Sequence, residues 1–489
     1  MSFGGGIMKK YISQLLPFLQ LPYHVYGKDM QVSHITYDSR RVREGSLFVA
    51  IKGFKSDGHD HIPQAMEKGA AALLVDHPIE NGMPQIVSKD TRRAMAEIAF
   101  GFWGCAYNNF ELTGITGTNG KTTMTHLLYQ LAEKAGRVPA LIGTLGIRTS
   151  EGSVEGSRTT PESADLAHTF YDLDKQGVNS IFMEVSSHAL DLKRVHSLRF
   201  DAAMFTNLTQ DHLDFHEDME AYFTAKTKLF EQMKFGAGAI VNIDDAYGAR
   251  LHKDLMIKKI SYAVDDPNAD YHFDQLSVNV DGIHGSMMTP GGKISINAPL
   301  LGKFNAENIA GSIACWEYLY PDTLDLNDFP FEPVAGRMEM VRTSKATAVI
   351  DYAHTPDAME KALKTASELD NRKDIITVFG CGGDRDKMKR PLMGAVAEKY
   401  SDKMIVTNDN PRKEDPRIIV DGILEGIKDI AKVDICIDRE KAITKAWKAS
   451  KPGDILMILG KGAETYMEIK GKNLPFNDKE IMLKLEQKK

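Results

Sequence analysis

A run of small and polar residues around one lysine, residues 117–123, is the segment best suited to binding phosphate. Its glycines let backbone N–H groups approach phosphate oxygens, the Lys121 ammonium can neutralise their charge, and the Thr122 hydroxyl can hold Mg²⁺. A strand-like run, ELTGIT, precedes it and a helix-patterned run, MTHLLYQLAEKAG, follows it. This order is typical of a nucleotide-binding unit and predicts that phosphates contact Gly117, Thr118, Asn119, Gly120, Lys121, Thr122 and Thr123.

The same run also fits a simpler interpretation, a glycine turn that caps a helix and carries a lysine by chance. Position 115 is Ile, and the preceding glycine is Gly114, one residue earlier than the pattern GxxxxGK[ST] requires. This departure argues against an ordinary GTPase or kinase loop. The strand before the run and the helix after it nevertheless favour a phosphate-binding role.

Three further residues, Glu184, His212 and Lys226, form a second candidate constellation. Glu184 and His212 follow strand-like runs, and oxygen-rich coordination at such a place suits Mg²⁺. Taken singly, Glu184 is as well explained as a helix N-cap or a salt-bridge partner, and Lys226 as a solvated helical lysine. Only their combination indicates a metal site.

The elements that must position these residues alternate between strand and helix patterns. Residues 1–108 mix short β-type runs and turns with a helical stretch near residues 91–103, which predicts a small α/β domain. The runs SIFMEVS, DAAMFTNL and AGAIVNI then alternate with helical segments, which predicts a doubly wound parallel sheet. Residues 266–299 show period-2 patterns broken by turns and predict an antiparallel insertion. After FPFEPVAGR, the runs ATAVIDYA, DIITVFG, KMIVTND and DILMILG predict a second α/β sheet.

Length, charge and cysteine usage narrow the class of protein. At roughly 150 residues per domain, 489 residues predict about three domains. The net charge of -7 comes from 60 basic and 67 acidic residues that are interspersed, which argues against binding of nucleic acid or an anionic membrane. The four cysteines form no CxxC pair, and no stretch approaches the roughly 20 apolar residues of a membrane span. We therefore expect a cytoplasmic monomer that acts on small molecules.

Many short runs, in their order along the chain, resemble those of the Mur ligases, and they cover nearly the whole sequence. Within that family the match is nearest to the branch that adds meso-diaminopimelate. The resemblance implies an α/β protein with a small α/β UDP-substrate-binding domain (1–108), a doubly wound P-loop ATPase-like central ATP-binding domain (109–333) and a Rossmann-like C-terminal amino-acid-binding domain (334–489). The runs are TGTNGKTT, TTPES, EVSSHAL, TNLTQDHLDFH, LGKFNAEN, GRME, DYAHTPDA, GCGGDRDKMKRP, DNPR and GKGAE.

By this resemblance, the chain is an ATP-dependent amide ligase of peptidoglycan biosynthesis. The γ-phosphoryl group of ATP passes to the D-glutamyl carboxylate of UDP-N-acetylmuramoyl-L-alanyl-D-glutamate, and an amine of meso-diaminopimelate attacks the resulting acyl phosphate. The resemblance makes Lys226 a carbamylated lysine, an anionic ligand for Mg²⁺. It also assigns catalysis to Lys121, Glu184, His212 and Lys226, the metal to Thr122, Glu184, His212 and Lys226, and further ATP contacts to Asn308, Arg337 and Asp351.

The two remaining substrates are assigned in the same way. For the UDP precursor, the resemblance points to Ser39, the loop 54–56, Thr159, Thr160, Ser186 and Arg194. The sequence departs from the family pattern at Arg158, where relatives commonly have Asn, and at Leu192, where some have Gln. For diaminopimelate, it points to Arg385, Asp409, Asn410, Pro411, Arg412, Gly460 and Glu464.

Three alternatives stay open at this point. The first is a sister ligase that adds L-lysine with the same architecture. The second is a folylpolyglutamate synthase, which resembles this family in its ATP machinery, although EVSSHAL and DNPR fit the Mur branch better. The third is a non-catalytic nucleotide-binding regulator or scaffold protein. The presence of Lys121, Glu184, His212 and Lys226 argues against the third.

Overall fold

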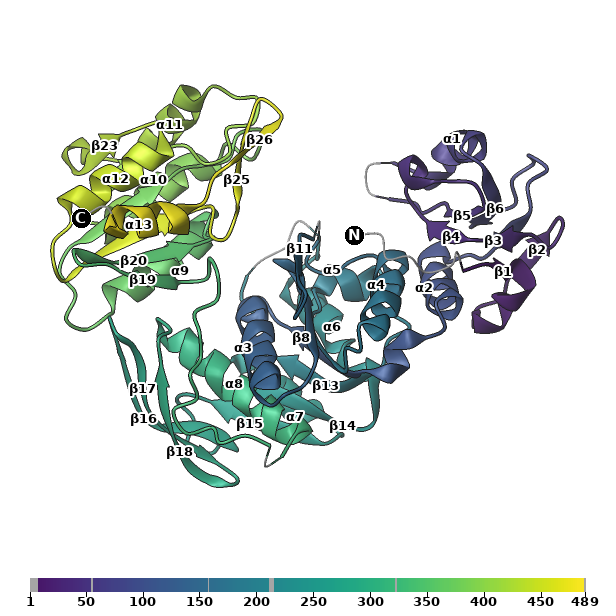
Figure 1. Cartoon of the computed structure of the whole chain (residues 1–489), viewed down its shortest axis with the longest axis horizontal. Helices are drawn as coiled ribbons and strands as arrows, with labels where there is room; N and C mark the ends of the chain where they lie inside the picture. The colour runs from purple at the N-terminus through teal and green to yellow at the C-terminus, as the bar shows by residue number, and fades with distance from the viewer. Residues whose placement is uncertain (1–7, 54–55, 157, 211–214, 322, 488–489) are drawn as a thin grey trace. The chain divides into compact units, whose positions relative to one another are not determined.

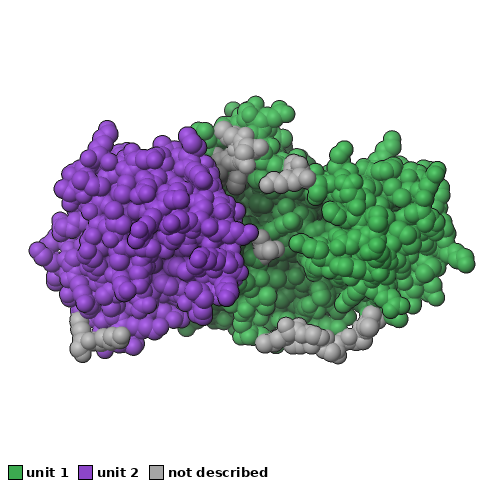
Figure 2. Space-filling model, turned by 90° about the horizontal axis from the view of Figure 1, so that it is seen from above, with its two compact units in different colours: residues 1–261, 315–321 green, residues 262–314, 322–489 purple. Residues whose placement is uncertain are grey.

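Two units make up the chain in the computed structural model, which describes residues 8–53, 56–156, 158–210, 215–321 and 323–487 (Figures 1 and 2). Unit 1 comprises residues 1–261 and 315–321, and unit 2 comprises residues 262–314 and 322–489. No helix in the described ranges is both long and apolar enough to cross a bilayer.

The first part of unit 1 is a five-stranded sheet with helices against it (Figure 1). Strands β4 to β7 are parallel, and β2 pairs antiparallel with β7 at one edge. The strand order is β2 (His24–Tyr26), β7 (Gln85–Val87), β6 (Ala70–Val75), β5 (Ser46–Val49) and β4 (His34–Thr36). The accompanying helices are α1 (Ile62–Glu67) and α2 (Thr91–Phe102), and α2 confirms the helix expected near residues 91–103.

The second part of unit 1 is a larger sheet whose centre is parallel. Strands β9, β12, β8, β13 and β14 run in that order and in the same direction. Their bounds are β8 (Glu111–Thr116), β9 (Pro139–Gly143), β12 (Ser180–Glu184), β13 (Phe200–Phe205) and β14 (Met233–Asn242). At one side β9 continues into the hairpin β10 (Gly146–Thr149) and β11 (Gly152–Val154), and at the other β14 is followed by β15 (Lys259–Ala263).

Helices connect these parallel strands, as a doubly wound sheet requires. They are α3 (Lys121–Lys134), α4 (Ser163–Lys175), α5 (Ser187–Asp191), α6 (Met219–Thr227) and α7 (Ala246–Asp254). The register pairs Glu184 with Ile115 and Phe205 with Thr116, so β12, β8 and β13 end together. The loops that follow these three strands therefore meet at one edge, where ligands bind in such sheets.

Unit 2 includes the antiparallel strands β16 (Tyr271–Asn279), β17 (Gly282–Thr289) and β18 (Gly292–Ala298). Helix α8 (Lys303–Leu319) follows, and its residues 315–319 belong to unit 1. These three strands confirm the antiparallel insertion expected within residues 266–299.

The rest of unit 2 is a six-stranded sheet covered on both faces (Figure 1). Alternation along the strands explains the two cores: Val349 packs with helices α9 to α11, and its neighbour Ile350 packs with α12 and α13. The strand order is β19 (Glu339–Arg342), β20 (Ala346–Asp351), β24 (Asp454–Leu459), β21 (Ile375–Phe379), β22 (Lys403–Val406) and β23 (Val433–Ile435). The helices are α9 (Pro356–Ser367), α10 (Lys389–Tyr400), α11 (Pro416–Leu424), α12 (Arg439–Ala449) and α13 (Asp478–Gln487). A hairpin of β25 (Tyr466–Ile469) and β26 (Lys472–Pro475) precedes α13.

Candidate active site

The predicted phosphate loop joins β8 to α3 in unit 1. Gly117 has a φ of +149°, and a Cβ atom there would lie 1.8 Å from Thr206 Oγ1, so only glycine fits. Gly120 has a φ of +86° and is the N-cap of α3. The glycine that shapes the loop is thus Gly117, whereas Gly114 lies inside β8. This explains why the sequence departs from the usual spacing.

The segment after β13 holds the phosphate loop in place. The backbone N–H groups of Thr118 and Asn119 donate to the backbone and side-chain oxygens of Asn207, both at 2.9 Å. Thr206 Oγ1 donates to the carbonyl of Asn119 at 2.6 Å. Two loop N–H groups are therefore already bonded, and anion binding falls to the first turn of α3. Sequence reasoning missed Asn207, although the run TNLT directly after a strand was a signal.

Two lysines meet at one carbonyl of this loop. Lys121 Nζ donates to the carbonyls of Gly117 at 2.8 Å and Thr118 at 2.9 Å. Lys226 Nζ, on α6, donates to the same Gly117 oxygen at 2.8 Å. Lys226 is only 1% exposed, so its interpretation as a solvated lysine is wrong. Two ammonium groups on one oxygen repel each other, and negative charge placed nearby would relieve this repulsion.

Glu184 is the last residue of β12 and is 1% exposed. Its carboxylate accepts hydrogen bonds from the Thr144 N–H at 2.8 Å and the Thr144 hydroxyl at 3.1 Å. It is not an N-cap, because Ser186 caps α5. A buried carboxylate beside the phosphate-loop strand suits Mg²⁺, and so does the nearly buried hydroxyl of Thr122. His212, the third predicted ligand, lies outside the described residues.

Three residues predicted for the UDP precursor, Thr160, Ser186 and Arg194, lie together near the buried carboxylate of Glu162 in unit 1. Thr160 Oγ1 donates to the Glu184 carbonyl at 2.9 Å and accepts from the Ser186 N–H at 3.2 Å. Arg194 donates to the Thr160 carbonyl at 3.1 Å and pairs with Glu162 at 3.0 Å. Burial lowers the pKa of Arg194, while Glu162 acts in the opposite direction.

Arg158, one of the two departures from the family pattern, also contacts Glu162, and Arg92 pairs with Glu162 at 3.4 Å. Glu162 therefore lies at the centre of this cluster and pairs with three arginines. Sequence reasoning missed both Glu162 and Arg92, because the carboxylate gains its role only through these distant partners.

The other positions predicted for the precursor are Thr159, Ser39 and the loop 54–56, and Leu192 is the second departure from the family pattern. The hydroxyl groups of Thr159 and Thr144 lie 3.0 Å apart. Leu192, the second departure, ends α5 as its C-cap. Ser39 begins the 3₁₀ helix Ser39–Arg41 after β4, where its hydroxyl donates to Gln64 Oε1 at 2.7 Å. Of the predicted loop 54–56, only Ser56 is among the described residues.

The further ATP residues, Asn308, Arg337 and Asp351, belong to unit 2. Asn308 is buried on α8 and donates to Asn305 Oδ1 at 2.9 Å. Asp351 ends β20 and accepts from the N–H groups of Ala353 at 2.8 Å and Met338 at 2.7 Å. Burial raises the pKa of Asp351, whereas the Arg337 guanidinium acts to lower it.

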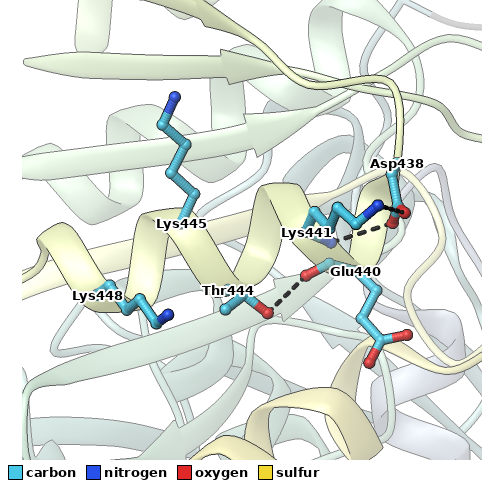
Figure 3. Close-up of a pocket in the computed structure, with 6 residues that line it drawn as sticks. All are labelled: Asp438, Glu440, Lys441, Thr444, Lys445 and Lys448. Carbon is cyan, nitrogen blue, oxygen red and sulfur yellow. Dashed lines mark hydrogen bonds and ion pairs between the residues drawn. The ribbon is translucent and has the colours of Figure 1, made fainter.

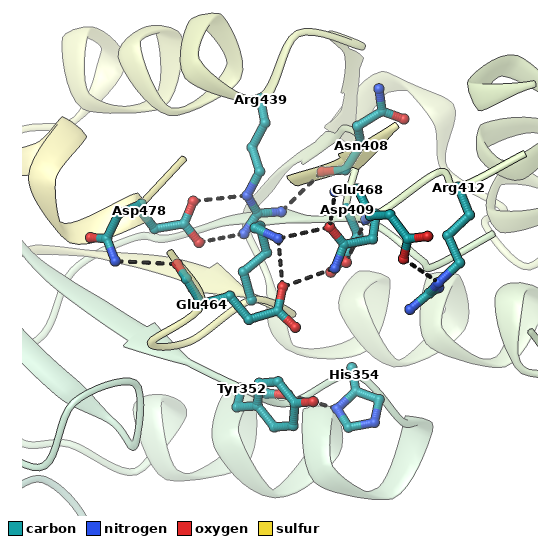
Figure 4. A network of polar contacts seen from close by, with 12 residues as sticks. Tyr352, His354, Asn408, Asp409, Arg412, Arg439, Glu464, Glu468 and Asp478 are labelled. Carbon is teal, nitrogen blue, oxygen red and sulfur yellow. Dashed lines mark hydrogen bonds and ion pairs between the residues drawn. The ribbon is translucent and has the colours of Figure 1, made fainter. Parts of the chain in front are cut away.

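A connected polar network fills the loops after β22 and β24 (Figure 4). Asn410 Nδ2 donates to Glu464 Oε2 at 2.9 Å, and the fully buried Lys461 donates to the same oxygen at 2.6 Å. Gly460 must be glycine, because its φ is +113° and a Cβ would lie 2.4 Å from Asp409 Oδ2. The structure thus brings most of the predicted amino-acid-binding residues together. Lys461 was missed, although it stands inside GKGAE.

Arg412 lies at one end of this network. Its Nε donates to Glu468 Oε2 at 3.1 Å and its Nη1 to the Gly383 carbonyl at 2.8 Å. Within the part of the chain that the structure describes, Nη2 has no protein partner. Arg385 is exposed, and the ideal Cβ of Gly382 would lie 2.9 Å from Arg412 Nη1 and 3.7 Å from Arg385 Cγ. The two arginines therefore flank the same glycine.

A fully buried ion pair supports both loops (Figure 4). Arg439, at the start of α12, binds Asp478 of α13 through Nε at 2.8 Å and Nη2 at 2.7 Å. It also donates to the carbonyl of Asn408 at 3.1 Å and of Leu459 at 3.0 Å. These carbonyls directly precede Asp409 and Gly460, so Arg439 ties the two loops to the C-terminal helix.

We expect Arg439→Met alone to lower the free energy of unfolding by about 3 to 5 kcal/mol, because it leaves Asp478 buried without its partner. The double variant Arg439→Met, Asp478→Leu should recover about half of this loss, since no charge remains buried but two carbonyls lack their donor. Urea unfolding of both variants measures the difference. A double variant as unstable as the single one would contradict this account.

A shallow pocket on α12 lies apart from these residues (Figure 3). Lys441 binds Asp438 at 3.1 Å, and Thr444 donates to the Glu440 carbonyl at 2.8 Å. None of the predicted substrate residues lines it. Its lining residues are Asp438, Glu440, Lys441, Thr444, Lys445 and Lys448.

Comparison with family models and with curated relatives shows which family the chain belongs to. Models of the Mur ligase family catalytic domain, the Mur ligase middle domain and the Mur ligase glutamate ligase domain match residues 31–103, 115–316 and 336–462. A relative from Aquifex aeolicus, named UDP-N-acetylmuramoyl-L-alanyl-D-glutamate--2,6-diaminopimelate ligase, is 43% identical over 92% of this chain and 93% of its own. A relative of that name from Geobacter metallireducens is 41% identical over the same shares. The chain therefore belongs to the Mur ligase family.

Solved structures confirm the predicted fold class. A structure titled UDP-N-acetylmuramoyl-L-alanyl-D-glutamate--2,6-diaminopimelate ligase matches with a TM-score of 0.69 at 31% identity, over 98% of this chain and 99% of its own. MurF from Acinetobacter baumannii matches with a TM-score of 0.62 at 16% identity over 99% and 100%. A folylpolyglutamate synthase from Mycobacterium tuberculosis matches with a TM-score of 0.60 at 17% identity over 76% and 92%. The last two show a shared fold only.

Proposed function

We propose that this chain joins meso-diaminopimelate to the D-glutamyl carboxylate of UDP-N-acetylmuramoyl-L-alanyl-D-glutamate, at the expense of ATP. The names of relatives that are 43% and 41% identical over most of the chain support this reaction. The observation that carries it is the convergence of Lys121 and Lys226 on the Gly117 carbonyl, at the sheet edge where Glu184 ends β12. This edge gathers positive charge and one buried carboxylate where the phosphoryl group would be transferred.

In this proposal the loop and its lysine hold the triphosphate while the precursor presents its carboxylate. Lys121 leaves the Gly117 and Thr118 carbonyls to bind phosphate oxygens, and the first turn of α3 adds its N–H groups. Thr160, Ser186 and Arg194 supply hydroxyl and guanidinium donors for the oxygens of the precursor. A Mg²⁺ ion held by Thr122, Glu184 and His212 would shield the phosphate charges.

The same geometry supports our proposal that Lys226 is carbamylated. Because the ammonium groups of Lys121 and Lys226 share one acceptor oxygen, loss of a proton from Lys226 relieves their repulsion. The neutral amine then attacks CO₂, an N–C bond forms, and a second proton leaves to give a carbamate anion. The anion would attract Lys121 and offer oxygen ligands to Mg²⁺. The deep burial of Lys226 protects such a labile group from water.

We further propose that the enzyme works as a monomer in the cytoplasm. All four cysteines are free in the structure, which suits a reducing compartment.

Recognition of the third substrate depends on the far end of its side chain. Diaminopimelate carries there a carboxylate and an ammonium group, and lysine carries only the ammonium group. In our proposal the carboxylate binds Arg412 through Nη2 while the ammonium approaches Glu464. Lysine would not leave Arg412 without any partner, because Glu468 already pairs with Arg412 at 3.1 Å. We therefore expect discrimination near the lower end of the range for a lost charged partner, roughly 30-fold.

Steady-state competition between meso-diaminopimelate and L-lysine tests this function. The wild type should prefer diaminopimelate by about 30-fold or more in kcat/KM, and Arg412→Ala should raise KM for diaminopimelate and narrow the gap. Arg417→Ala on α11 is the matched control and should change neither value. Equal specificity constants in the wild type, or unchanged discrimination in Arg412→Ala, would favour the lysine-adding alternative.

A further inference from the structure

Two histidines and an aspartate come together in loops beside the first sheet of unit 1, among the residues that the structure describes there. His59 lies in the 3₁₀ turn Gly58–His61, and Asp76 and His77 directly follow β6. His59 Nε2 lies 3.2 Å from Asp76 Oδ1, and His77 Nδ1 contacts the same oxygen. The three ligand atoms all lie within 4.8 Å of one another. Residues up to 18 positions apart thus converge from two loops, and none of the three is among the residues assigned above to phosphate, precursor or amino-acid binding.

A fourth residue, Asp57, fixes the orientation of His59. Asp57 Oδ1 lies 2.6 Å from His59 Nδ1 and also accepts from the His59 backbone N–H at 3.0 Å. Because a carboxylate only accepts, the hydrogen bond places a proton on Nδ1. Nε2 then accepts a long hydrogen bond from the Asp76 backbone N–H at 3.5 Å and lies 3.2 Å from Asp76 Oδ1. The His59 side chain is only 10% exposed, so it cannot turn the Nε2 lone pair to solvent freely.

We propose that His59, Asp76 and His77 form a binding site for a divalent transition-metal ion such as Zn²⁺, Co²⁺ or Ni²⁺. When no cation or proton lies between them, the Nε2 lone pair and the Asp76 Oδ1 atom repel each other at 3.2 Å, and only the long hydrogen bond from the Asp76 N–H at 3.5 Å opposes this repulsion. A metal ion turns the same arrangement into two ligand bonds. Asp57 then plays the part of the outer carboxylate that orients a ligating histidine through its other ring nitrogen.

The donor set selects the kind of ion. Two imidazole nitrogens and one carboxylate oxygen suit Zn²⁺, Co²⁺ and Ni²⁺, whereas Mg²⁺ is bound mainly through oxygen ligands and water. The two imidazole rings are stacked with centroids 4.7 Å apart, so His77 must turn for both lone pairs to reach one ion. Its side chain is 61% exposed, which leaves room for this rotation. Water completes the shell on the open side, so we expect weaker binding than at a closed four-residue site.

The site would tie the 3₁₀ turn that precedes α1 to the end of β6. Binding to the folded chain alone stabilises it by mass action, by about 2.7 kcal/mol at an ion concentration 100 times Kd. This stabilisation does not depend on the ligase reaction, because none of the three ligands belongs to the residues assigned to catalysis.

The test uses the full-length chain without a histidine tag, treated with chelator and dialysed. Calorimetric titration with Zn²⁺, and Co²⁺ titration followed by visible absorption, should each show one saturable site that a large excess of Mg²⁺ does not empty. Asp76→Asn and His77→Ala should each weaken binding at least about tenfold, a usual effect of losing one metal ligand or its support. His61→Ala, an exposed histidine of the same 3₁₀ turn, is the matched control and should bind like the wild type.

Thermal unfolding gives a second measurement. Zn²⁺ should raise the Tm of the wild type and of His61→Ala, but not of Asp76→Asn or His77→Ala, and circular dichroism without metal should be the same for all four proteins. No saturable binding, or binding that both ligand variants retain, would overturn the proposal. An equal loss of Zn²⁺ binding in His61→Ala would also overturn the proposal, because that outcome indicates nonspecific binding of the ion by surface histidines.

Discussion

Lys121→Ala is expected to reduce turnover by at least about 10³-fold, the scale on which a cation at a transferring phosphoryl group acts. Lys121 is the first residue of α3, and its amine reaches the carbonyls of Gly117 and Thr118. Its removal leaves the loop backbone anchored, because Asn207 holds the N–H groups of Thr118 and Asn119. The loss should therefore come from missing charge at the phosphates and not from a collapsed loop. Amino-acid-dependent release of phosphate measures it.

Calorimetric titration separates this effect from misfolding. Lys121→Ala should bind the UDP precursor as tightly as the wild type, because the precursor residues form a separate cluster around Glu162. Lys134→Ala, in the last turn of the same helix and exposed, serves as the control and should keep full activity. Parallel loss of precursor affinity and activity would show that the phosphate loop and the precursor site are not separate.

Replacing Lys226 is expected to reduce turnover by a similar factor, but for a different reason. Lys226→Ala removes the proposed carbamate, an anionic metal ligand worth several kcal/mol, so turnover should fall by about 10³-fold at saturating Mg²⁺. The fold should persist, because α6 keeps its buried residues Tyr222 and Phe223. Short carboxylic acids should restore part of the activity of Lys226→Ala by occupying the place of the carbamate. A variant that keeps more than about half of wild-type activity would exclude a ligand role of that size.

Two further variants show whether the loss of turnover is specific to a carbamate on Lys226. Lys226→Met preserves most of the buried side-chain volume and should be as inactive as Lys226→Ala, without rescue by small acids. Lys228→Ala changes a half-exposed lysine of the same helix end, which pairs with Asp191, and should remain active. In ¹³C-enriched bicarbonate, the wild type should show a carbamate resonance that is missing in Lys226→Met. Its absence from the wild type would refute carbamylation even if Lys226 proved essential.

The sequence by itself determined the features that depend on local pattern. The strand, phosphate loop and helix around Lys121 could be predicted because their periods and glycines lie within about thirty residues. The antiparallel strands β16 to β18 were predictable for the same reason, and so was each strand-like run of the second α/β sheet. Family resemblance then assigned roles to side chains such as Asn410 and Glu464, which the structure places 2.9 Å apart.

Only the tertiary structure decided which charged groups are buried and which face each other. Lys226 reads as an exposed helical lysine, yet packing brings it against the carbonyl of Gly117, 109 residues away. Glu162 pairs with Arg92 and Arg194, and Arg439 pairs with Asp478, across separations of 32 to 70 residues. Burial and charge pairing depend on how whole elements pack, and a local period carries no information about a partner a hundred residues away.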